Sequence, residues 1–401
     1  MELILNIIQY GLTALILLVG FSSLYLMFLA FFGVKFAYTS PINSKVVSPN
    51  HQLAILVPAY KNDEVLLDST KHNLKILQNL QGIDFHYIPL CDRVQEGTLK
   101  ALHEQGAHPF EISLDKSTKS RAINQWLDAE KQTLYTHVLV LDVDNLLHPD
   151  NLAHGLYNGL NDQHNWWQFK RIAANTNTQI AGLDAWSEIV NNNIFRRGAQ
   201  KLGIPPALIG SGMLAPFNSF AEIHHKIDVT GGFDKWVEHY LMQQDIKVKY
   251  CDEVWIKDQK IADLGALKKQ RTRWLAAQFL IAKQLLPTLL KSIFTLKLGR
   301  ALKYYQLYLP PRILHLALAI VLPLITFWQK DIFLLSTLNL LALLIAFTVA
   351  TPWGSHFKVL GLFAKNGIKL VWNYLGMFKG FKEANEKFIA TQHQSNEKDS
   401  N

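Results

Sequence analysis

The stretch His137-Val-Leu-Val-Leu-Asp-Val-Asp-Asn145 decides the fold of this chain. It opens with a run of strand-forming residues and ends in two carboxylates that are two residues apart. If Asp142 still belongs to the strand, Val143 faces away from it, and the carboxylates of Asp142 and Asp144 lie on one side. Such a pair can approach a divalent cation and a diphosphate, since Mg²⁺ and Mn²⁺ favour one or two carboxylates together with phosphate oxygens. The alternative is a solvated acidic turn or a helix cap.

Strand and helix signals alternate on the N-terminal side of this stretch. Strands are predicted at residues 54–58, 85–90 and 109–114, and helices at residues 64–77, at 95–104 and from residue 117 onward. This alternation predicts an α/β fold, a doubly wound and mostly parallel sheet with helices on both faces. Ligands bind such sheets beyond the carboxyl ends of the strands. Asp92, Asp142 and Asp144 follow the second and fourth strands, so we expect them to converge at one edge.

Three apolar stretches predict membrane-spanning helices. Residues 3–34 contain no charged residue, and about 20 apolar residues suffice to cross the roughly 30 Å of bilayer hydrocarbon. We interpret this stretch as a retained transmembrane helix, because a cleaved signal peptide would have a short apolar core and a basic start. Residues 313–328 and 332–350 are also apolar, and Gln329-Lys-Asp331 separates them. They predict a helical hairpin with a short external turn.

The charge balance favours a membrane surface over nucleic acid as the partner. The chain carries 40 Lys and Arg against 32 Asp and Glu, a net charge of +8, and lysines flank the C-terminal apolar block on both sides. Basic flanks are typical of the cytosolic side, so we expect a multi-pass protein of the cell membrane whose soluble domain is cytosolic. The sequence has no zinc module and no aromatic-basic single-strand platform, and no nucleic-acid partner is expected. Cys91 and Cys251 lack metal-ligand spacing, which fits a reducing compartment.

These signals divide the chain into six parts. The expected parts are an N-terminal transmembrane helix (1–35), a cytosolic domain (48–285), an amphipathic interfacial segment (286–312), the transmembrane hairpin (313–350), an amphipathic C-terminal segment (357–391) and a disordered tail (392–401). The segment after the hairpin mixes lysines with Leu, Phe and Trp. That mixture favours a helix lying on the membrane over a further crossing, and membrane lipids are therefore expected partners.

Lys119 and two glycine pairs are candidates for contact with a charged ligand. Lys119 follows the third predicted strand, where its charge would neutralise a diphosphate; the alternative is an ordinary exposed helix lysine. Gly210-Ser-Gly212 and Gly231-Gly232 allow the backbone to approach a ligand closely, or they form plain turns.

A polar and aromatic cluster marks the predicted helix that follows the soluble domain's strands. Gln270, Arg273 and Trp274 fall at positions i, i+3 and i+4, so they share one helix face. Arg offers bidentate donors to a phosphate, and Trp offers a flat apolar face to a sugar ring. The alternative is an interfacial helix whose Trp and Arg lie at the lipid headgroups.

Transfer to a hydroxyl group would also need a base. The candidates in residues 231–240 are Asp234, Glu238 and His239. Their periodicity does not rank them.

The ordered set of these pieces resembles the family 2 glycosyltransferases, in the membrane-bound branch related to cellulose and hyaluronan synthases. The matching pieces are Val57-Pro-Ala-Tyr60, Asp92, Lys119 with Ser120-Arg-Ala-Ile-Asn124, Asp142-Val-Asp144, Gly210-Ser-Gly212, Gly231-Gly-Phe-Asp234 and Gln270-Arg-Thr-Arg-Trp274. The resemblance covers residues 50–285 and the membrane layout. Gln-x-x-Arg-Trp is its most diagnostic element.

The resemblance implies a GT-A fold and an inverting transfer that depends on Mg²⁺ or Mn²⁺. It places Pro58 and Asp92 at the nucleotide, with Asp92 holding the uracil or ribose, and Lys119 near them. Asp142 would face the donor and, with Asp144, bind the metal. By the same resemblance, the diphosphate and the end of the acceptor would bind to Gln270, Arg273 and Trp274.

One departure from the family pattern concerns the base. The family usually carries a Glu-Asp pair after Gly-Gly, whereas here Glu238 is followed by His239. Glu238 is taken as the catalytic base because a carboxylate is charged at pH 7 and can accept a proton, with His239 as the alternative. The role of Glu64, in a motif that also departs from the family, is left open.

The expected function is transfer of a sugar from a nucleotide sugar, a UDP-sugar by resemblance, to a lipid-linked or growing polysaccharide acceptor at the membrane. Self-association or other polysaccharide-assembly proteins are the expected protein partners. The alternative is a catalytically inactive membrane subunit of such an assembly. A transporter is disfavoured because the apolar runs contain no charged residue. A nucleotidyltransferase would not need the Gln-x-x-Arg-Trp helix.

Overall fold

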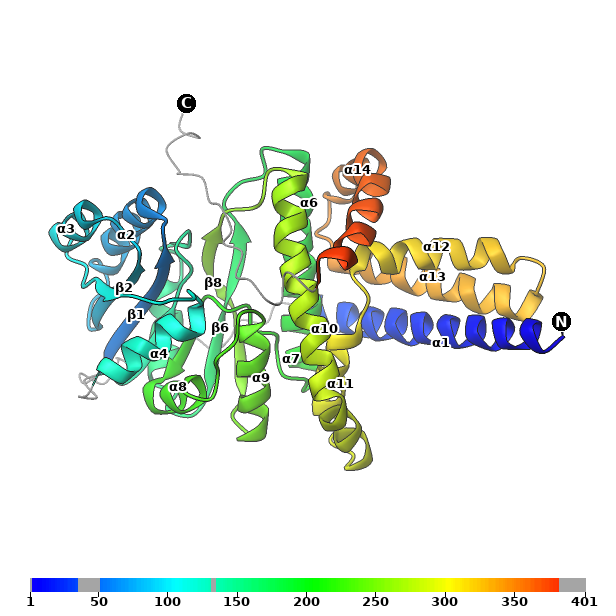
Figure 1. Cartoon of the computed structure of the whole chain (residues 1–401), viewed down its shortest axis with the longest axis horizontal. Coiled ribbons are helices and arrows are strands. Elements are labelled where there is room, and N and C mark those ends of the chain that lie inside the picture. Colours follow the sequence, from blue (N-terminus) through cyan, green and yellow to red (C-terminus); the bar gives the residue numbers. More distant parts are fainter. Residues whose placement is uncertain (1, 35–50, 131–134, 382–401) are drawn as a thin grey trace. The chain divides into compact units, whose positions relative to one another are not determined.

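The computed structural model describes residues 2–34, 51–130 and 135–381 (Figure 1). The chain divides into two compact units. One, here called the sheet unit, comprises residues 37–185, 205–283 and 380–401. The other, the helical unit, comprises residues 1–36, 186–204 and 284–379. Each unit is therefore assembled from segments that are far apart in the sequence.

The sheet unit contains one eight-stranded sheet with the order β3-β2-β1-β4-β7-β6-β8-β5. The strands are β1 Gln52–Tyr60, β2 Asp84–Asp92, β3 Phe110–Ile112, β4 His137–Val140, β5 Leu146–Leu147, β6 Trp166–Ala173, β7 Met213–Pro216 and β8 Val248–Asp258. The first four strands pair with one another in parallel, as predicted. Strand β7 is antiparallel to both β4 and β6, β6 and β8 are parallel, and β5 is antiparallel to β8. The fold is thus a mixed α/β fold whose N-terminal half is parallel.

Successive residues of β1 belong to two hydrophobic layers, one on each face of the sheet. Leu53 and Ile55 pack in the layer that contains α2 (Asp63–Leu77), α3 (Glu96–Glu104) and α5 (Leu152–Leu160). Ala54 and Leu56 pack in the layer that contains α4 (Lys119–Ala129), α8 (Phe217–His224) and α9 (Phe233–Gln243). Because side chains alternate along a strand, a run of apolar residues is required where both faces are covered. The prediction of helices on both faces is confirmed.

The register of the parallel strands places their carboxyl ends at a common edge. Strand β1 pairs with β2 from Gln52 opposite Asp84 to Tyr60 opposite Asp92. On its other side it pairs with β4, where Leu56 lies opposite Val140. The side chains that follow β1, β2 and β4 therefore emerge at one edge of the sheet.

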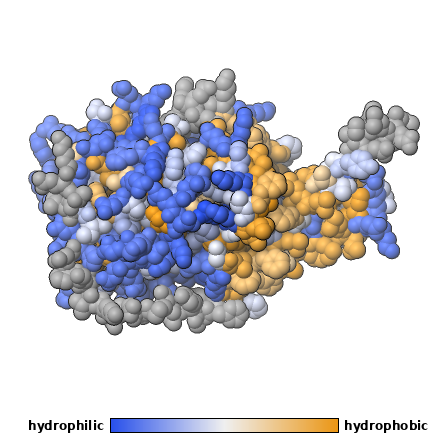
Figure 2. Space-filling view, turned by 90° about the horizontal axis from the view of Figure 1, so that it is seen from below, coloured by the Kyte–Doolittle hydropathy of each residue, from blue (hydrophilic) through white to orange (hydrophobic). Residues whose placement is uncertain are grey.

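The helical unit contains the long apolar helices. Its elements are α1 Glu2–Gly33, η1 Asn192–Gly198, α7 Ala199–Lys201, α11 Leu298–Tyr305, η2 Gln306–Tyr308, α12 Arg312–Thr326, α13 Lys330–Ala350 and α14 His356–Met377. Apolar residues gather over the surface of its helices (Figure 2). The helices α6 (Gln179–Asn191) and α10 (Leu264–Phe294) each contribute residues to both units.

Two of these helices are long and apolar enough to cross a membrane, Gln9–Gly33 and Lys330–Ala350. Helix α12 has 15 residues, about 22 Å at 1.5 Å per residue, which is short of the roughly 30 Å of bilayer hydrocarbon. It qualifies as a span only together with Leu298–Tyr308, from which it is bent by 83°. The second helix of the expected hairpin is therefore a full-length candidate, and the first is part of a broken pair.

In the segment that was predicted to be amphipathic, the described residues form α14 and the short 3-10 helix η3 (Phe378–Gly380). Its exposed apolar side chains include Phe357, Leu360, Ile368 and Trp372. The predicted disordered tail, residues 392–401, lies outside the described residues. The predicted domain boundaries remain predictions.

Candidate active site

The segment that leads from β3 into α4 contacts two of the predicted carboxylates. Asp92 is the last residue of β2, and Asp142 follows β4 by two residues. The Ser117 hydroxyl donates a hydrogen bond to Asp92 Oδ2. Two residues further on, Lys119 Nζ lies 2.5 Å from Asp142 Oδ1. The structure therefore brings Asp92, Lys119 and Asp142 together at the predicted edge of the sheet.

Asp92 is a buried carboxylate with one unsatisfied oxygen. The residue is 2% exposed, and within the described part of the chain its Oδ1 has no hydrogen-bond partner. Arg93 Nε lies 3.9 Å from this atom. Because leaving a buried acceptor unpaired costs about 1–3 kcal/mol, Oδ1 suits a ligand that presents an N–H or O–H group. A nucleobase or a ribose offers such donors.

The ends of β1 and β2 are backbone-strained next to this carboxylate. Lys61 and Arg93, the residues after the two strands, have φ angles of 51° and 56°. Arg93 donates a hydrogen bond to the Tyr60 hydroxyl over 3.2 Å, and Pro58 lies two residues before Tyr60 in β1. Left-handed backbone at non-glycine residues clusters at binding sites. The sequence motif around Tyr60 is thus placed at the same edge as Asp92.

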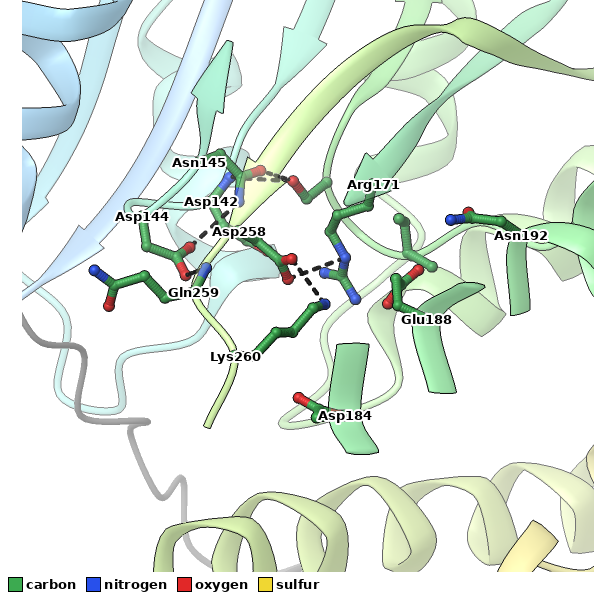
Figure 3. A network of polar contacts seen from close by, with 12 residues as sticks. Asp142, Asp144, Asn145, Arg171, Asp184, Glu188, Asn192, Asp258, Gln259 and Lys260 are labelled. Carbon is green, nitrogen blue, oxygen red and sulfur yellow. Dashed lines mark hydrogen bonds and ion pairs between the residues drawn. The ribbon is translucent and has the colours of Figure 1, made fainter. Parts of the chain in front are cut away.

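The turn after β4 gives Asp142 and Asp144 different surroundings. The Asp142 side chain is 39% exposed, whereas Asp144 is 4% exposed. Asp144 accepts hydrogen bonds from the Asn145 side-chain amide (3.3 Å) and from the Gln259 backbone N–H (3.2 Å), as Figure 3 shows. The Asp142 N–H donates to Asn145 Oδ1 and Ser211 Oγ. This turn is therefore fixed from both sides before any ligand binds.

Asn73, a residue of α2 that was not predicted from the sequence, holds the acidic turn by hydrogen bonds. Asn73 is fully buried. Its amide nitrogen donates to the Asn145 carbonyl over 2.9 Å, and its oxygen accepts from the Leu147 N–H over 2.8 Å. Asn145 was visible in the sequence beside the acidic pair, but Asn73 is 72 residues away from it. No local signal connects the two.

The acidic turn fits a divalent cation that is shared with a phosphate ligand. Among the described residues there is no group of three or more His, Cys, Asp or Glu that could hold a metal by itself. Mg²⁺ is commonly held by one or two carboxylates together with substrate phosphates. Asp142 and Asp144 are the two carboxylates of this turn that would hold the cation. Lys119 adds a positive charge beside Asp142, as a diphosphate site requires.

The loop Gly210-Ser-Gly212, which leads into β7, depends on its glycines for its conformation and packing. Gly210 and Gly212 have φ angles of +74° and +63°. A Cβ added at Gly212 would lie 2.8 Å from the Ile256 side chain. The Gly210 carbonyl accepts a 2.5 Å hydrogen bond from Lys119, and the Ser211 carbonyl accepts one from the buried amide of Gln168. The loop therefore faces the Lys119–Asp142 pair with its backbone.

The three base candidates lie on α9 in different surroundings. Asp234 lies in the first turn, and its Cβ would be 3.9 Å from a Cβ added at Gly210. Lys235 Nζ lies 3.2 Å from Asp234 Oδ2 and 3.0 Å from Glu238 Oε1. The Asp234 side chain is 25% exposed. Asp234 thus adjoins the loop whose carbonyl contacts Lys119.

Glu238 and His239 are placed deeper in the structure. Glu238 is 6% exposed, and its Oε1 accepts a 2.7 Å hydrogen bond from the Leu208 backbone N–H. His239 packs edge-on against Trp236, and burial lowers the pKa of its imidazole. Glu238 thus ties α9 to the backbone at Leu208.

The helix α10 presents the predicted Gln-x-x-Arg-Trp residues. Gln270 Oε1 is buried and, within the described residues, has no hydrogen-bond partner. Burial lowers the pKa of Arg273, and the nearby negative charge of Asp142 opposes that shift. Arg273 is therefore close enough to the acidic turn to sense its charge. Trp274 is 40% exposed.

A glycine pair sets the distance between α9 and α10. A Cβ added at Gly231 would lie 3.3 Å from the Ala277 Cβ, and one at Gly232 would lie 2.4 Å from the Ile281 side chain. Gly232 also has a φ of +69°. The two glycines therefore let the start of α9 approach α10 closely at Ala277 and Ile281.

A family model described as "Glycosyltransferase like family 2" matches residues 49–277, more than half of the chain. The chain therefore belongs to glycosyltransferase-like family 2. It is a glycosyltransferase. No curated protein matches it.

Three solved structures illustrate the similarity. The mannosyltransferase PcManGT from Pyrobaculum calidifontis, in complex with GDP-Man and Mn²⁺, has a TM-score of 0.48 and 14% identity over 86% of this chain and 97% of its own. The glucosyl-3-phosphoglycerate synthase from Mycobacterium tuberculosis, with Mn²⁺, UDP and glucosyl-3-phosphoglycerate, has a TM-score of 0.37 and 13% identity over 56% and 78%. TarS 1–349 from S. aureus, with UDP-GlcNAc, has a TM-score of 0.33 and 10% identity over 52% and 59%. All three scores lie below 0.5, so the assignment rests on the family model.

Proposed function

We propose that this glycosyltransferase is an inverting enzyme of the GT-A type that uses a nucleotide sugar, in the first instance a UDP-sugar, and a divalent cation, Mg²⁺ or Mn²⁺. The observation that carries the proposal is the segment in which Ser117 contacts Asp92 and Lys119 contacts Asp142. That segment joins a buried acceptor suited to a nucleoside to a half-exposed acidic turn suited to a diphosphate. A nucleoside diphosphate requires both groups side by side.

Each predicted residue has a role in this proposal. Asp92 would accept a hydrogen bond from the nucleoside, which would lie beside Pro58. Lys119 and Arg273 would balance the negative charge of the departing diphosphate. Asp144 and Asp142 would hold the cation, which adds positive charge against the leaving group when it is bound.

The base accepts the proton of the acceptor hydroxyl as that oxygen attacks the anomeric carbon. Glu238 is the base expected from the sequence, but its Oε1 is engaged by the Leu208 N–H and by Lys235. The geometry favours Asp234, which is more exposed and adjoins Gly210. In this arrangement Lys235, held by Glu238, would orient the Asp234 carboxylate. His239 remains the third candidate.

The acceptor side of the proposal rests on the membrane features. The two helices long enough to span a bilayer and the exposed apolar side chains of α14 support an enzyme held at the cell membrane. The acceptor would be a lipid-linked or growing polysaccharide, and the catalytic domain would be cytosolic. The resemblance to cellulose and hyaluronan synthases supports the same class, with self-association or other polysaccharide-assembly proteins as partners.

A donor screen tests the proposal directly. The full-length protein in detergent is heated with UDP-glucose, UDP-N-acetylglucosamine or GDP-mannose, each with Mn²⁺ or with a chelator. We expect one of them to raise the unfolding temperature only when Mn²⁺ is present, and to be turned over. If no nucleotide sugar protects the protein or is cleaved, the proposed function is wrong.

Three carboxylate variants then assign the roles. Asp144→Asn is expected to remove Mn²⁺-dependent protection and to lower turnover by about 10²–10³-fold, the typical cost of losing one group that stabilises transition-state charge. Asp150→Asn is the matched control, because its side chain is 60% exposed. If Asp234 is the base, Asp234→Asn abolishes turnover and keeps donor protection. If Glu238→Gln does so while Asp234→Asn retains turnover, Glu238 is the base.

A further inference from the structure

Arg271 lies between an aspartate of α6 and the exposed tryptophan of α10. Its guanidinium carbon is 4.2 Å from the centroid of the Trp274 ring, and its Nη2 forms an ion pair with Asp184 Oδ1. The side chains of Arg271 and Asp184 are 16% and 10% exposed. All three residues belong to the sheet unit. Neither Arg271 nor Asp184 is among the residues expected from the sequence to contact a ligand.

This arrangement fixes the orientation of the tryptophan. A guanidinium over an aromatic face is attracted by the ring quadrupole, and the attraction grows when water is excluded. The ion pair with Asp184 holds the guanidinium in place, and its planar shape suits stacking in a way that a lysine ammonium does not. The rotamer of Trp274 is therefore restrained by Arg271 of the same helix, which is itself held by Asp184 of α6.

Among the tryptophans that the structure describes in this unit, Trp274 is the most exposed. Trp126 and Trp166 are 3% and 0% exposed, so their rings serve the hydrophobic layers. Trp274 is 40% exposed, and its orientation is nevertheless fixed by a largely buried ion pair. Holding an exposed aromatic ring in one place adds little to the core and is the arrangement that an aromatic binding platform needs.

A second feature of the same helix face points to a ligand. Gln270, four residues before Trp274 and so on the same side of α10, has a buried Oε1 without a hydrogen-bond partner among the described residues. A sugar can contact both groups, because its C–H face packs on an aromatic ring such as Trp274 and its hydroxyls donate hydrogen bonds to an oxygen such as Gln270 Oε1.

We propose that Asp184 and Arg271 are positioning residues that hold Trp274 as the platform for the sugar ring of the acceptor. The inference rests on the proposed function, since it deepens the acceptor side of the same site. It predicts that loss of either residue weakens transfer to the acceptor and spares cleavage of the donor by water.

The test measures two reactions in one preparation. The nucleotide sugar that protects the protein is supplied with native membranes as the source of acceptor, and sugar incorporation is compared with release of the free sugar. Arg271→Lys, Asp184→Asn and Trp274→Ala are expected to lower the ratio of transfer to hydrolysis about tenfold, which corresponds to about 1.4 kcal/mol. The control Lys269→Ala, an exposed cation on the same helix, keeps the wild-type ratio.

A charge-swapped double variant separates positioning from folding. In Asp184→Arg with Arg271→Asp the ion pair is restored but no guanidinium extends from position 271 over Trp274. We expect a wild-type unfolding temperature together with a low transfer ratio. Recovery of the ratio in this variant, or equal losses of transfer and hydrolysis in the single variants, would overturn the inference. Absence of both reactions in the wild-type enzyme would instead overturn the proposed function.

Discussion

Lys119 contacts two parts of the site, the acidic turn at Asp142 and the loop at Gly210. Its ammonium group lies 2.5 Å from both Asp142 Oδ1 and the Gly210 carbonyl. A diphosphate that enters the site gains this positive charge, and a charge-assisted hydrogen bond is worth about 1.5–3 kcal/mol. We therefore expect Lys119→Gln to raise the donor concentration needed for half-maximal protection about tenfold to a hundredfold.

The measurement is a donor titration of the unfolding temperature at fixed Mn²⁺. Lys100→Gln is the control, because Lys100 is 71% exposed and pairs with Glu96 within one helix. An unchanged titration curve in Lys119→Gln would show that this lysine only holds the loop at Gly210.

At this scale the sequence predicts the acidic residues well and their partners poorly. The convergence of Asp92 and Asp142 follows from strands that run parallel, which alternation already indicates. The partners Asn73 and Gln259 come from distant segments, and only tertiary packing selects them. Asp234 and Glu238 lie one turn apart on α9, so periodicity could not say which one is buried.

At the scale of the elements, the long and strongly patterned segments were predictable. Strands β1, β2 and β4 and their parallel pairing are confirmed, because apolar runs between helices have few other solutions. The antiparallel insertion of β7 between β4 and β6 was not predicted, since an apolar stretch of four residues is too short to carry a periodic signal. The bend of 83° before α12 lies at Pro310 and Pro311. It was not predicted, because hydropathy marks an apolar helix and does not show where the chain bends before it.

The junction of α1 with η1 in the helical unit gives a prediction about an element. Gly198 ends the π-helix η1, and a Cβ there would lie 2.0 Å from the Leu29 carbonyl oxygen of α1. Because that oxygen belongs to the backbone of another helix, it cannot rotate away. We expect Gly198→Ala to destabilise the helical unit by about 1–3 kcal/mol, the usual cost of overpacking.

Gly11→Ala is the matched control, since Gly11 is also helical and a Cβ there meets nothing within 4 Å. Thermal unfolding in detergent should show a lower midpoint for Gly198→Ala and an unchanged or slightly higher one for Gly11→Ala, because alanine favours helix. Equal midpoints for the two variants would contradict the tight contact.

At the scale of the whole molecule, the division into units was only partly foreseeable. Hydropathy marks α1 and α13 as membrane helices. It does not show that residues 186–204, within the expected cytosolic domain, belong to the helical unit. This segment contains the buried pair of Glu188 and Arg196, whose side chains lie 2.8 Å apart. Charged residues that pair inside a packed helical unit look like surface residues in a sequence.

Two buried histidines of the sheet unit contribute most clearly to the pH dependence of stability. Burial lowers the pKa of His137 to about 4, with a smaller contribution from His51 that Asp162 partly opposes. Burial also lowers the pKa of His224 to about 3. Below the ordinary pKa of about 6.5, the unfolded chain binds these two protons and the folded chain does not. Acid therefore favours unfolding over this range.

Stability should consequently fall as the pH drops from 6.5 towards 4, by up to about 1.4 kcal/mol per pH unit for each histidine. Thermal unfolding of the wild type between pH 7.5 and 4.5 measures this slope. His137→Gln and His224→Gln should each have a shallower slope whatever their absolute stability, while the exposed His154→Gln keeps the wild-type slope. Each variant is compared with the wild type over the same pH range, so the contribution of the carboxylates, which begin to titrate towards the acid end of it, cancels in the difference. A wild-type slope in both buried-histidine variants would mean that neither imidazole stays neutral in the fold.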